Sequence, residues 1–356
     1  MELMDKACSV KERILSIDAL RGFDMFWLIG GNELGRSIFQ VYNHPVTVAI
    51  SNQFSHSQWR GFHLEDFIFP LFLFIVGLVL PFSMAKHIQT NERPVRLYLH
   101  IFKRTAILFV LGMLAGGLLL KFEVRWVGVL QRIAVCYIIA AILFLHTGWR
   151  TQAFIAAGIL IVSWPMMTML NMPGYDCIYL DKAFLKAMPK VAETGIWIMS
   201  VPSTLFGVLA GHWLRSNNSG NRKSLCLAMG GMIFILIALA LDRAGYLVVF
   251  RAWTGSFVML TAGLSMVLLS IFYWIIDVKC YRKWAAFFVV IGTNAILAYW
   301  LRRSSIIDFQ SIANFFVLGF ATRCGIFEPM VLAIGFTAVQ WLLLYFLYRH
   351  KIFLKA

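Results

Sequence analysis

Two histidines and two acidic residues share one short polar segment, which reads Ser55-His56-Ser57-Gln58-Trp59-Arg60-Gly61-Phe62-His63-Leu64-Glu65-Asp66. A neutral imidazole can act as a general base toward an amine or hydroxyl, or can itself accept an acyl group. A neighbouring carboxylate can orient such a ring, and Asp66 or Glu65 could do so here. Asp66 is equally suited to the first turn of a helix that begins at this point. Because a histidine in a loop is more often an ordinary surface residue, the segment alone indicates only a candidate site.

A second set of polar residues lies within apolar stretches. Asp18 and Arg21 are three residues apart and therefore share one face of a helix. Asn32 and Glu33 fall at the far end of the same stretch. Ionisable groups inside a membrane span are costly, so each is a functional hypothesis. The competing interpretations are a structural ion pair for Asp18 and Arg21, and a polar helix end for Asn32 and Glu33.

Further candidates for binding or orienting a substrate are Arg132, Asn294 and Trp59. Arg132 is expected about two turns inside its helix, where an arginine needs a partner or a polar cavity. Asn294 could equally make an ordinary hydrogen bond between helices. The six cysteines form no CxxC pair, so neither a disulfide framework nor a metal site is expected.

The apolar residues around these groups predict the elements that position them. Hydrophobic residues make up 60% of the chain and charged residues 14%, against roughly 45–50% and about 25% in soluble domains. A membrane-spanning helix needs about 20 mostly apolar residues, and the sequence predicts about ten such helices. They are residues 15–34, 66–85, 104–120, 126–146, 152–171, 196–214, 224–242, 254–276, 284–301 and 327–348.

The predicted fold is therefore an all-α, polytopic membrane bundle made of one domain, residues 1–356. Residues 36–65 are expected to form an outer loop that carries His56. Residues 305–322 are apolar but contain Asp308, Gln310 and Asn314, so a re-entrant or interfacial segment is expected there.

The distribution of basic residues predicts the orientation in the membrane. The formal net charge is +15, and the loops on the side of the N-terminus are the richer in Lys and Arg. The positive-inside rule then makes both termini cytoplasmic and places Asn32 and His56 on the outer side. The charge also suits anionic lipid headgroups. Since no nucleic-acid motif is present, nucleic-acid binding is not expected.

Several groups of residues resemble a known family. The segments Asp18 to Gly22, Asn32, His56 to Gly61 and Asp66 to Phe72 resemble the N-terminal signature of the heparan-α-glucosaminide N-acetyltransferase family. Further similar blocks are Gly128 to Ala134, Gly207 to Gly211, Gly292 to Tyr299, and the tail from Tyr348 to Lys355. The first block is specific and the others are supportive.

The resemblance implies a transmembrane acyltransferase with His56 and Asn32 as its catalytic residues. It would move an acetyl group from cytosolic acetyl-CoA to an amino sugar or sugar hydroxyl outside the cytoplasm. The lysosomal members carry a lumenal domain and an extra span before the signature helix, and neither is expected here. An envelope glycan or a scavenged sugar is thus as suitable an acceptor as heparan sulfate. A bacterial inner (plasma) membrane location and a homodimer are also expected.

The anionic phosphates of CoA favour Arg and Lys donors. The candidates expected on the cytoplasmic side are Arg13, Arg21, Lys103 and Arg104. Anchoring by the positive-inside rule explains Lys103 and Arg104 equally simply. The residues leave open whether the acyl group is longer than acetyl, and whether His56 becomes acetylated or acts only as a base.

Two other classes of function fit the composition. Glycine-rich helices with intramembrane Asp and Arg also suit a transporter or flippase for a sugar-like or anionic substrate. No pair of matching broken helices is evident in the two halves of the sequence, however. A non-catalytic membrane scaffold or sensor is the third reading, and it predicts that acetyl-CoA does not bind.

Overall fold

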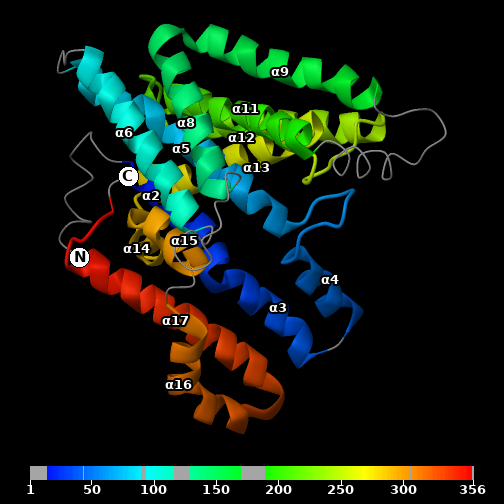
Figure 1. Ribbon diagram of the computed structural model, residues 1–356, viewed down its shortest axis with the longest axis vertical. Helices are drawn as coiled ribbons and strands as arrows, with labels where there is room; N and C mark the ends of the chain where they lie inside the picture. The colour runs from blue at the N-terminus through cyan, green and yellow to red at the C-terminus, as the bar shows by residue number, and fades with distance from the viewer. Residues whose placement is uncertain are drawn as a thin grey trace.

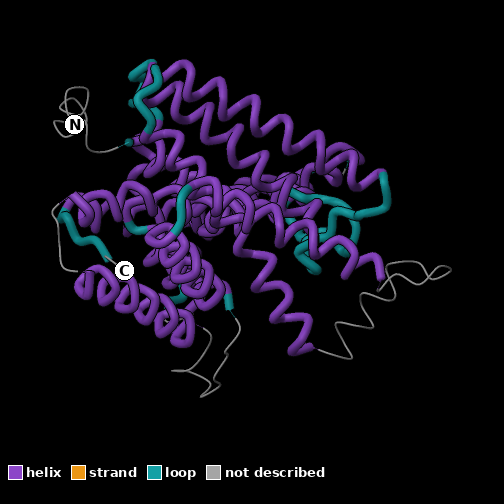
Figure 2. Tube along the Cα trace, turned by 90° about the horizontal axis from the view of Figure 1, so that it is seen from above, coloured by secondary structure: helices purple, strands orange, loops and turns teal. Residues whose placement is uncertain are grey.

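The computed structural model describes residues 14–42, 44–89, 94–115, 128–169, 189–304 and 307–354. Within these ranges the chain is helical and contains no strand, which confirms the all-α class (Figure 2). Isolated β-bridges join Arg60 and Gly61 to Val249.

The helices occupy the following ranges in chain order: α2 (Leu15–Phe26), the π-helical segment η2 (Trp27–Gly31), α3 (Asn32–Val41), α4 (Pro45–Gln53), α5 (Leu64–Gln89), α6 (Pro94–Met113), α8 (Val129–His146), α9 (Trp149–Met169), α11 (Pro189–Arg215), α12 (Gly220–Arg243), α13 (Gly255–Tyr273), η4 (Trp274–Val278), α14 (Ala285–Thr293), α15 (Ala295–Ser304), α16 (Phe309–Ala321), η5 (Thr322–Phe327) and α17 (Glu328–Arg349). Helix α2 packs against α5, α13 and α14, and α5 packs against α8, α11 and α13. The hairpin of α16 and α17 lies at one end of the view in Figure 1, and α9 lies at the opposite end.

Six helical segments are long and apolar enough to cross a membrane. They are Leu64–Met84, Val129–His146, Ile196–Arg215, Gly220–Arg243, Gly255–Val278 and Phe309–Arg349. A seventh is obtained if α14 and α15, bent by 70° relative to each other, form one broken span. The chain is thus a polytopic membrane protein, but the predicted count of ten spans is not confirmed. Three of the ten, 104–120, 126–146 and 152–171, include residues outside the described ranges.

Two segments that the sequence singles out, residues 36–65 and 305–322, both contain helices. The outer loop predicted for residues 36–65 is largely helical, because α3 continues to Val41 and α4 follows. His44 caps α4 with its side chain, and Pro45 suits the first helical position. The segment predicted at 305–322 forms α16, which folds back against α17 through η5.

A close backbone contact fixes α2 against α14. A Cβ atom on Gly22 would lie 1.7 Å from the backbone oxygen of Phe288. One on Gly292 would lie 1.9 Å from the backbone oxygen of Asp18. No side chain fits at either position, as is typical of helix pairs in membranes. Helix α2, which leads to the candidate site, is therefore held directly by the backbone of α14.

Segments predicted to share one side of the membrane meet at one end of the bundle. The Asp277 carboxylate accepts hydrogen bonds from the backbone N–H groups of Leu15 and Ser16, both at 3.1 Å. A Cβ on Gly220 would lie 2.7 Å from Val278. The start of α2, the turn before α12 and the turn after η4 are thus neighbours. This grouping agrees with the predicted topology, while the side that faces the cytosol stays a prediction.

Candidate active site

A break in the first long helix positions Asn32. Helix α2 passes into the π-helical segment η2, in which Gly30 has non-helical dihedral angles. Single π turns of this kind occur frequently at functional sites. The side-chain amide of Gln340 on α17 donates a hydrogen bond to the Ile29 carbonyl, 2.5 Å away. Asn32 begins the next helix directly after the break, so α17 helps to hold it in place.

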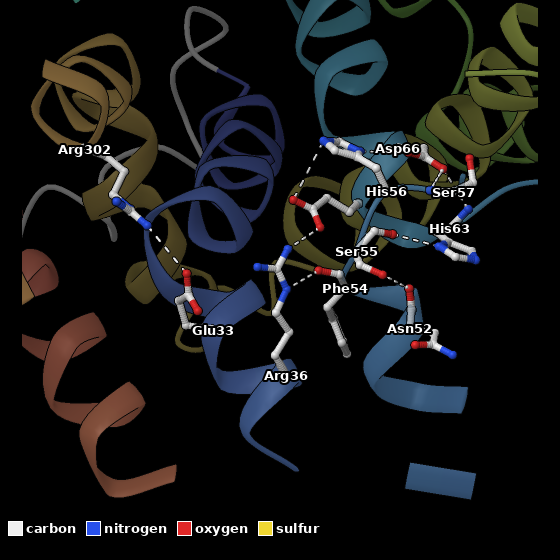
Figure 3. A network of polar contacts seen from close by, with 11 residues as sticks. Glu33, Arg36, Asn52, Phe54, Ser55, His56, Ser57, His63, Asp66 and Arg302 are labelled. Atoms are coloured by element: carbon white, nitrogen blue, oxygen red, sulfur yellow. Dashed lines mark hydrogen bonds and ion pairs between the residues drawn. The ribbon is translucent and has the colours of Figure 1, made fainter. Parts of the chain in front are cut away.

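The His56 ring is held by a buried carboxylate. Its Nδ1 atom lies 2.8 Å from Asp66 Oδ1 (Figure 3), and the Asp66 side chain is 0% exposed. Asp66 Oδ2 accepts hydrogen bonds from the backbone N–H groups of Ser57 at 3.2 Å and His63 at 3.1 Å. Because an ionised carboxylate only accepts hydrogen bonds, His56 carries its proton on Nδ1. Nε2 is then the free basic atom of the neutral ring. This arrangement matches the orienting role expected for Asp66.

A second loop supports the same ring. Phe250 stacks on His56 with the ring centroids 4.8 Å apart and the planes within 13°. The loop of Phe250 is tied to the histidine segment where Gly61 N–H donates to the Val248 carbonyl at 3.1 Å. Gly61 has a φ of 108°, a conformation that favours glycine. The two loops therefore fix the histidine from both sides.

The surroundings of His56 make its ring more basic than a free imidazole. The hydrogen bond to Asp66 raises the pKa of His56, burial opposes this, and the charge of Glu65 adds to the increase. The charge of Arg251 acts in the opposite direction. The ring is a competent proton acceptor only once it has lost its own proton, at a pH above this raised pKa.

An ion pair that the sequence does not predict lies beside the Nε2 atom of His56. Arg36 Nη2 contacts Glu65 Oε2 at 2.6 Å, and Arg36 Nε donates to the Phe54 carbonyl at 2.6 Å. The other oxygen, Glu65 Oε1, lies 3.9 Å from His56 Nε2. Glu65 was expected only as an alternative partner for the ring. Its pairing with Arg36 joins α3 to α5, and no local pattern in the sequence indicates that contact.

One cavity of about 330 Å³ brings the two predicted catalytic residues together. Its polar lining consists of Asn32, Glu33, Arg36, His56, Glu65, Tyr299 and Arg302. Its apolar lining includes Met25, Leu28, Ile68, Phe69, Phe72, Val129, Leu130, Ile133, Phe250 and Ile296. Glu33, a predicted substrate residue, pairs with Arg302 at 3.6 Å (Figure 3). The site thus combines a polar wall with an apolar one, as small-molecule sites commonly do.

Arg132 lies near the same histidine but in a second hollow. This hollow, of about 280 Å³, is lined by His56, Ile196, Phe250, Arg251, Trp253 and Arg132. The Arg132 guanidinium lies over the rings of Phe69 at 5.1 Å and Trp253 at 5.0 Å. Such cation–π contacts stabilise a charge in an apolar setting. The expectation that Arg132 has a polar cavity beside it therefore agrees with its position.

Two predicted substrate residues lie away from the cavity. Trp59 is buried against Val249 and Ala252. The Asn294 side-chain amide donates to the Ile352 carbonyl at 2.9 Å and accepts from the Leu354 N–H at 3.1 Å. Neither residue is part of the cavity lining. Asn294 instead ties the C-terminal tail to the junction between α14 and α15, which is the structural alternative that its sequence context allowed.

The predicted CoA ligands also lie outside the lining of this cavity. Arg21 pairs with Asp18 at 3.7 Å. The Arg104 guanidinium lies over the Tyr137 ring at 4.7 Å, and Lys103 is exposed. Arg13 falls outside the described residues. Across the described ranges, no three His, Cys, Asp or Glu side chains are grouped so as to hold a metal ion.

Comparison with known proteins covers both predicted catalytic residues. A family model described as heparan-alpha-glucosaminide N-acetyltransferase, catalytic, matches residues 13–239. The human heparan-alpha-glucosaminide N-acetyltransferase is 23% identical over an alignment of 418 positions, which covers 96% of this chain and 60% of that protein. The mouse protein of the same name is 34% identical over 96 residues, 25% of this chain and 15% of that protein. The chain therefore matches about 60% of the length of the human protein and a smaller part of the mouse protein.

Proposed function

The chain belongs to the heparan-α-glucosaminide N-acetyltransferase family, and we propose that it moves an acetyl group from cytosolic acetyl-CoA to a sugar acceptor on the other side of the membrane. The family supports a transmembrane acetyltransferase in general. The observation that carries the specific proposal is the shared cavity of Asn32 and His56, in which the histidine is held by Asp66.

His56 is the proposed base. Its Nε2 atom takes the proton that the acceptor loses as it attacks the thioester carbonyl. Asp66 keeps the opposite nitrogen protonated and stabilises the imidazolium that forms, as the aspartate does in hydrolase triads. His56 could instead accept the acetyl group and pass it on, and the same contacts would orient the ring for that route.

Asn32 is the proposed electrophilic partner. Its side-chain amide makes no hydrogen bond to another described residue, so its N–H groups are available to a ligand. An amide donor directed at the thioester oxygen stabilises the negative charge that develops there, and loss of one such donor typically costs about 100- to 1,000-fold in rate. The π-helical break and Gln340 keep this residue at the cavity.

The apolar wall is the proposed place for the acetyl group and the arm that carries it. Apolar side chains from α2, α5, α8 and α15 surround this part of the cavity. They exclude water, and this protects a thioester from hydrolysis. The phosphates would lie toward the cytosolic end, where Arg13, Arg21, Lys103 and Arg104 are the proposed ligands. We further propose a bacterial inner-membrane location with both termini cytoplasmic.

The proposal is tested with purified protein, labelled acetyl-CoA and a panel of amino sugars. Acceptor-dependent release of CoA together with a labelled product is the expected result. The bend of 70° between α14 and α15 favours transport as the alternative, because broken helices are common in transporters. Uptake of sugar into proteoliposomes without consumption of acetyl-CoA would therefore support a transporter and contradict the enzyme.

A further inference from the structure

We propose that Glu65 binds the ammonium group of an amine acceptor beside His56, so that this carboxylate selects amines over hydroxyls. The inference rests on the acetyltransferase function proposed above. It assigns a specificity role to a residue that the sequence indicates only as an alternative partner for the histidine ring. This role depends on three features of Glu65: its distance from His56, the ion pair with Arg36 that holds it in place, and the charge of its carboxylate.

The spacing between Glu65 and His56 suits a bridging nitrogen. Glu65 Oε1 and His56 Nε2 lie 3.9 Å apart, which is too far for a direct hydrogen bond. One donor nitrogen placed about 3 Å from each atom would contact both of them. Both residues line the cavity that also contains Asn32. A nitrogen in this position would therefore face the proposed base and lie in the same cavity as the proposed electrophilic amide.

The Glu65 carboxylate is held in place before any ligand arrives. Arg36 contacts its Oε2 atom at 2.6 Å, and the Phe54 carbonyl fixes Arg36 by a second hydrogen bond of 2.6 Å. The Glu65 side chain is only 17% exposed. A fixed donor on one oxygen leaves the other oxygen directed toward Nε2. Such pre-organisation reduces the cost of binding, because the side chain does not have to be ordered when the ligand arrives.

The charge on Glu65 favours a cationic group over a neutral one at its Oε1 atom. Arg36 contacts the other oxygen of this carboxylate, and Glu33 is paired with Arg302. Asp66 contacts the opposite nitrogen of the His56 ring, and Arg251 is a further charge that acts on that ring. An ammonium nitrogen would make a charge-assisted hydrogen bond to Glu65 Oε1, which is stronger than the bond that a neutral hydroxyl would make there.

The transfer step balances with these residues. The bound ammonium group first loses one proton to water, and the resulting amine attacks the thioester carbonyl carbon. The C–N bond forms, the C–S bond breaks, and the bonding pair leaves with sulfur. His56 Nε2 removes the second proton from nitrogen and returns it to the thiolate, which yields the amide and free thiol. Glu65 remains a carboxylate throughout, so it acts through binding.

The competing explanation is that Glu65 only joins α5 to α3 through Arg36. Glu65→Gln separates the two explanations, because the amide keeps the shape and an acceptor oxygen for Arg36 but removes the charge. A purely structural residue would affect every acceptor alike. A residue that binds ammonium would affect amine acceptors much more than hydroxyl acceptors. Glu65→Asp, which keeps the charge on a shorter side chain, is the matched second variant.

The experiment compares the methyl glycosides of glucosamine and glucose as acceptors, with acetyl-CoA as donor. Hydrogen bonds to charged groups contribute about 1.5–3 kcal/mol, so Glu65→Gln should raise KM for the amine roughly 10- to 100-fold. Because the charge of Glu65 also raises the pKa of His56, the rates are compared at a pH above that pKa. There the rate with the hydroxyl sugar should fall far less than the rate with the amine, and the thermal shift caused by acetyl-CoA should not change. Glu65→Asp should retain more amine activity than Glu65→Gln.

Equal losses with both acceptors, or no loss with the amine, would overturn the role of Glu65 and leave the transferase intact. Full activity of Glu65→Gln combined with inactive Glu65→Asp would also overturn it, because charge would then be irrelevant. If the unaltered protein released no CoA with any acceptor, the proposed function itself would fail and the role of Glu65 with it.

Discussion

Asp66 Oδ1 and His56 Nδ1 lie 2.8 Å apart, and the contact joins a carboxylate that is 0% exposed to an imidazole whose side chain is 49% exposed. The Asp66 carboxylate cannot turn, because two backbone N–H groups donate hydrogen bonds to its second oxygen. The His56 ring therefore presents its Nε2 atom in a fixed direction. This asymmetry is what a proton acceptor at the wall of a cavity requires.

Replacing Asp66 should disable catalysis while the protein still folds. Asp66→Asn has nearly the same shape but no longer fixes the proton on Nδ1 of His56. We expect kcat to fall at least about 100-fold, within the usual range for lost acid–base catalysis. Initial rates of CoA release measure the effect. Asp308→Asn, at the exposed start of α16, is the matched control and should retain activity.

The pH dependence of acetyl transfer should follow the protonation state of His56. The hydrogen bond to Asp66 raises its pKa, and the nearby charges are those of Glu65, Asp66 and Arg251. The neutral ring is the base, so kcat/KM should increase as the pH rises through this raised pKa. The stabilisation that His56 gives to the folded protein has the opposite trend. This stabilisation is complete below the pKa of histidine in the unfolded chain, about 6.5, and is lost as the pH rises through the pKa of His56 in the folded protein.

Asp66→Asn should move the rising limb of residual activity to lower pH, because the main cause of the raised pKa is removed. A pH–rate profile of both proteins measures this shift. A limb that stays at the same pH would show that another group controls the rate.

The contact between α2 and α14 should tolerate no added methyl group. Gly22→Ala would place a Cβ 1.7 Å from the Phe288 oxygen, so the two backbones would have to separate. Overpacking of this kind typically costs about 1–3 kcal/mol. A lower melting temperature in detergent is expected. Gly230→Ala, where a Cβ would meet no atom within 4 Å, should leave that temperature unchanged or slightly higher.

The π-helical break should depend on Gln340. Gln340→Leu removes the donor that satisfies the Ile29 carbonyl, and an unsatisfied buried carbonyl costs about 1–3 kcal/mol. We expect a lower melting temperature and a lower kcat, because Asn32 follows the break directly. Gln310→Leu, on the exposed face of α16, is the control. Unchanged kinetics in Gln340→Leu would show that Asn32 does not rely on this contact.

The sequence indicates some candidate residues of the site and not others. It points to Asn32, His56 and Asp66, because polar groups at the ends of apolar stretches are unusual and because their motifs resemble a family. It does not indicate the ion pair of Arg36 and Glu65, since that contact depends on how α3 and α5 meet. It also predicts Asn294 as a possible substrate residue, but the C-terminal tail occupies its amide, a contact across 58 residues of sequence.

The prediction of the fold was limited in a similar way. Runs of apolar residues predict helices well, and the all-α class is confirmed. They do not show where a helix bends, because the break at Gly30 depends on α17 and the bend at Asn294 on the tail. The helix α4 could have been recognised from its cap, since His44, Pro45 and Thr47 form a start signal.

The most direct test of the account is acetyl transfer by His56→Ala, measured beside His63→Ala. His63 belongs to the same segment and its Nδ1 lies 2.7 Å from the Ser55 carbonyl, but it does not line the cavity. We predict that His56→Ala loses transfer by about 100-fold or more while still binding acetyl-CoA, and that His63→Ala remains active. Transfer at the unaltered rate by purified, folded His56→Ala would contradict the assignment of this site.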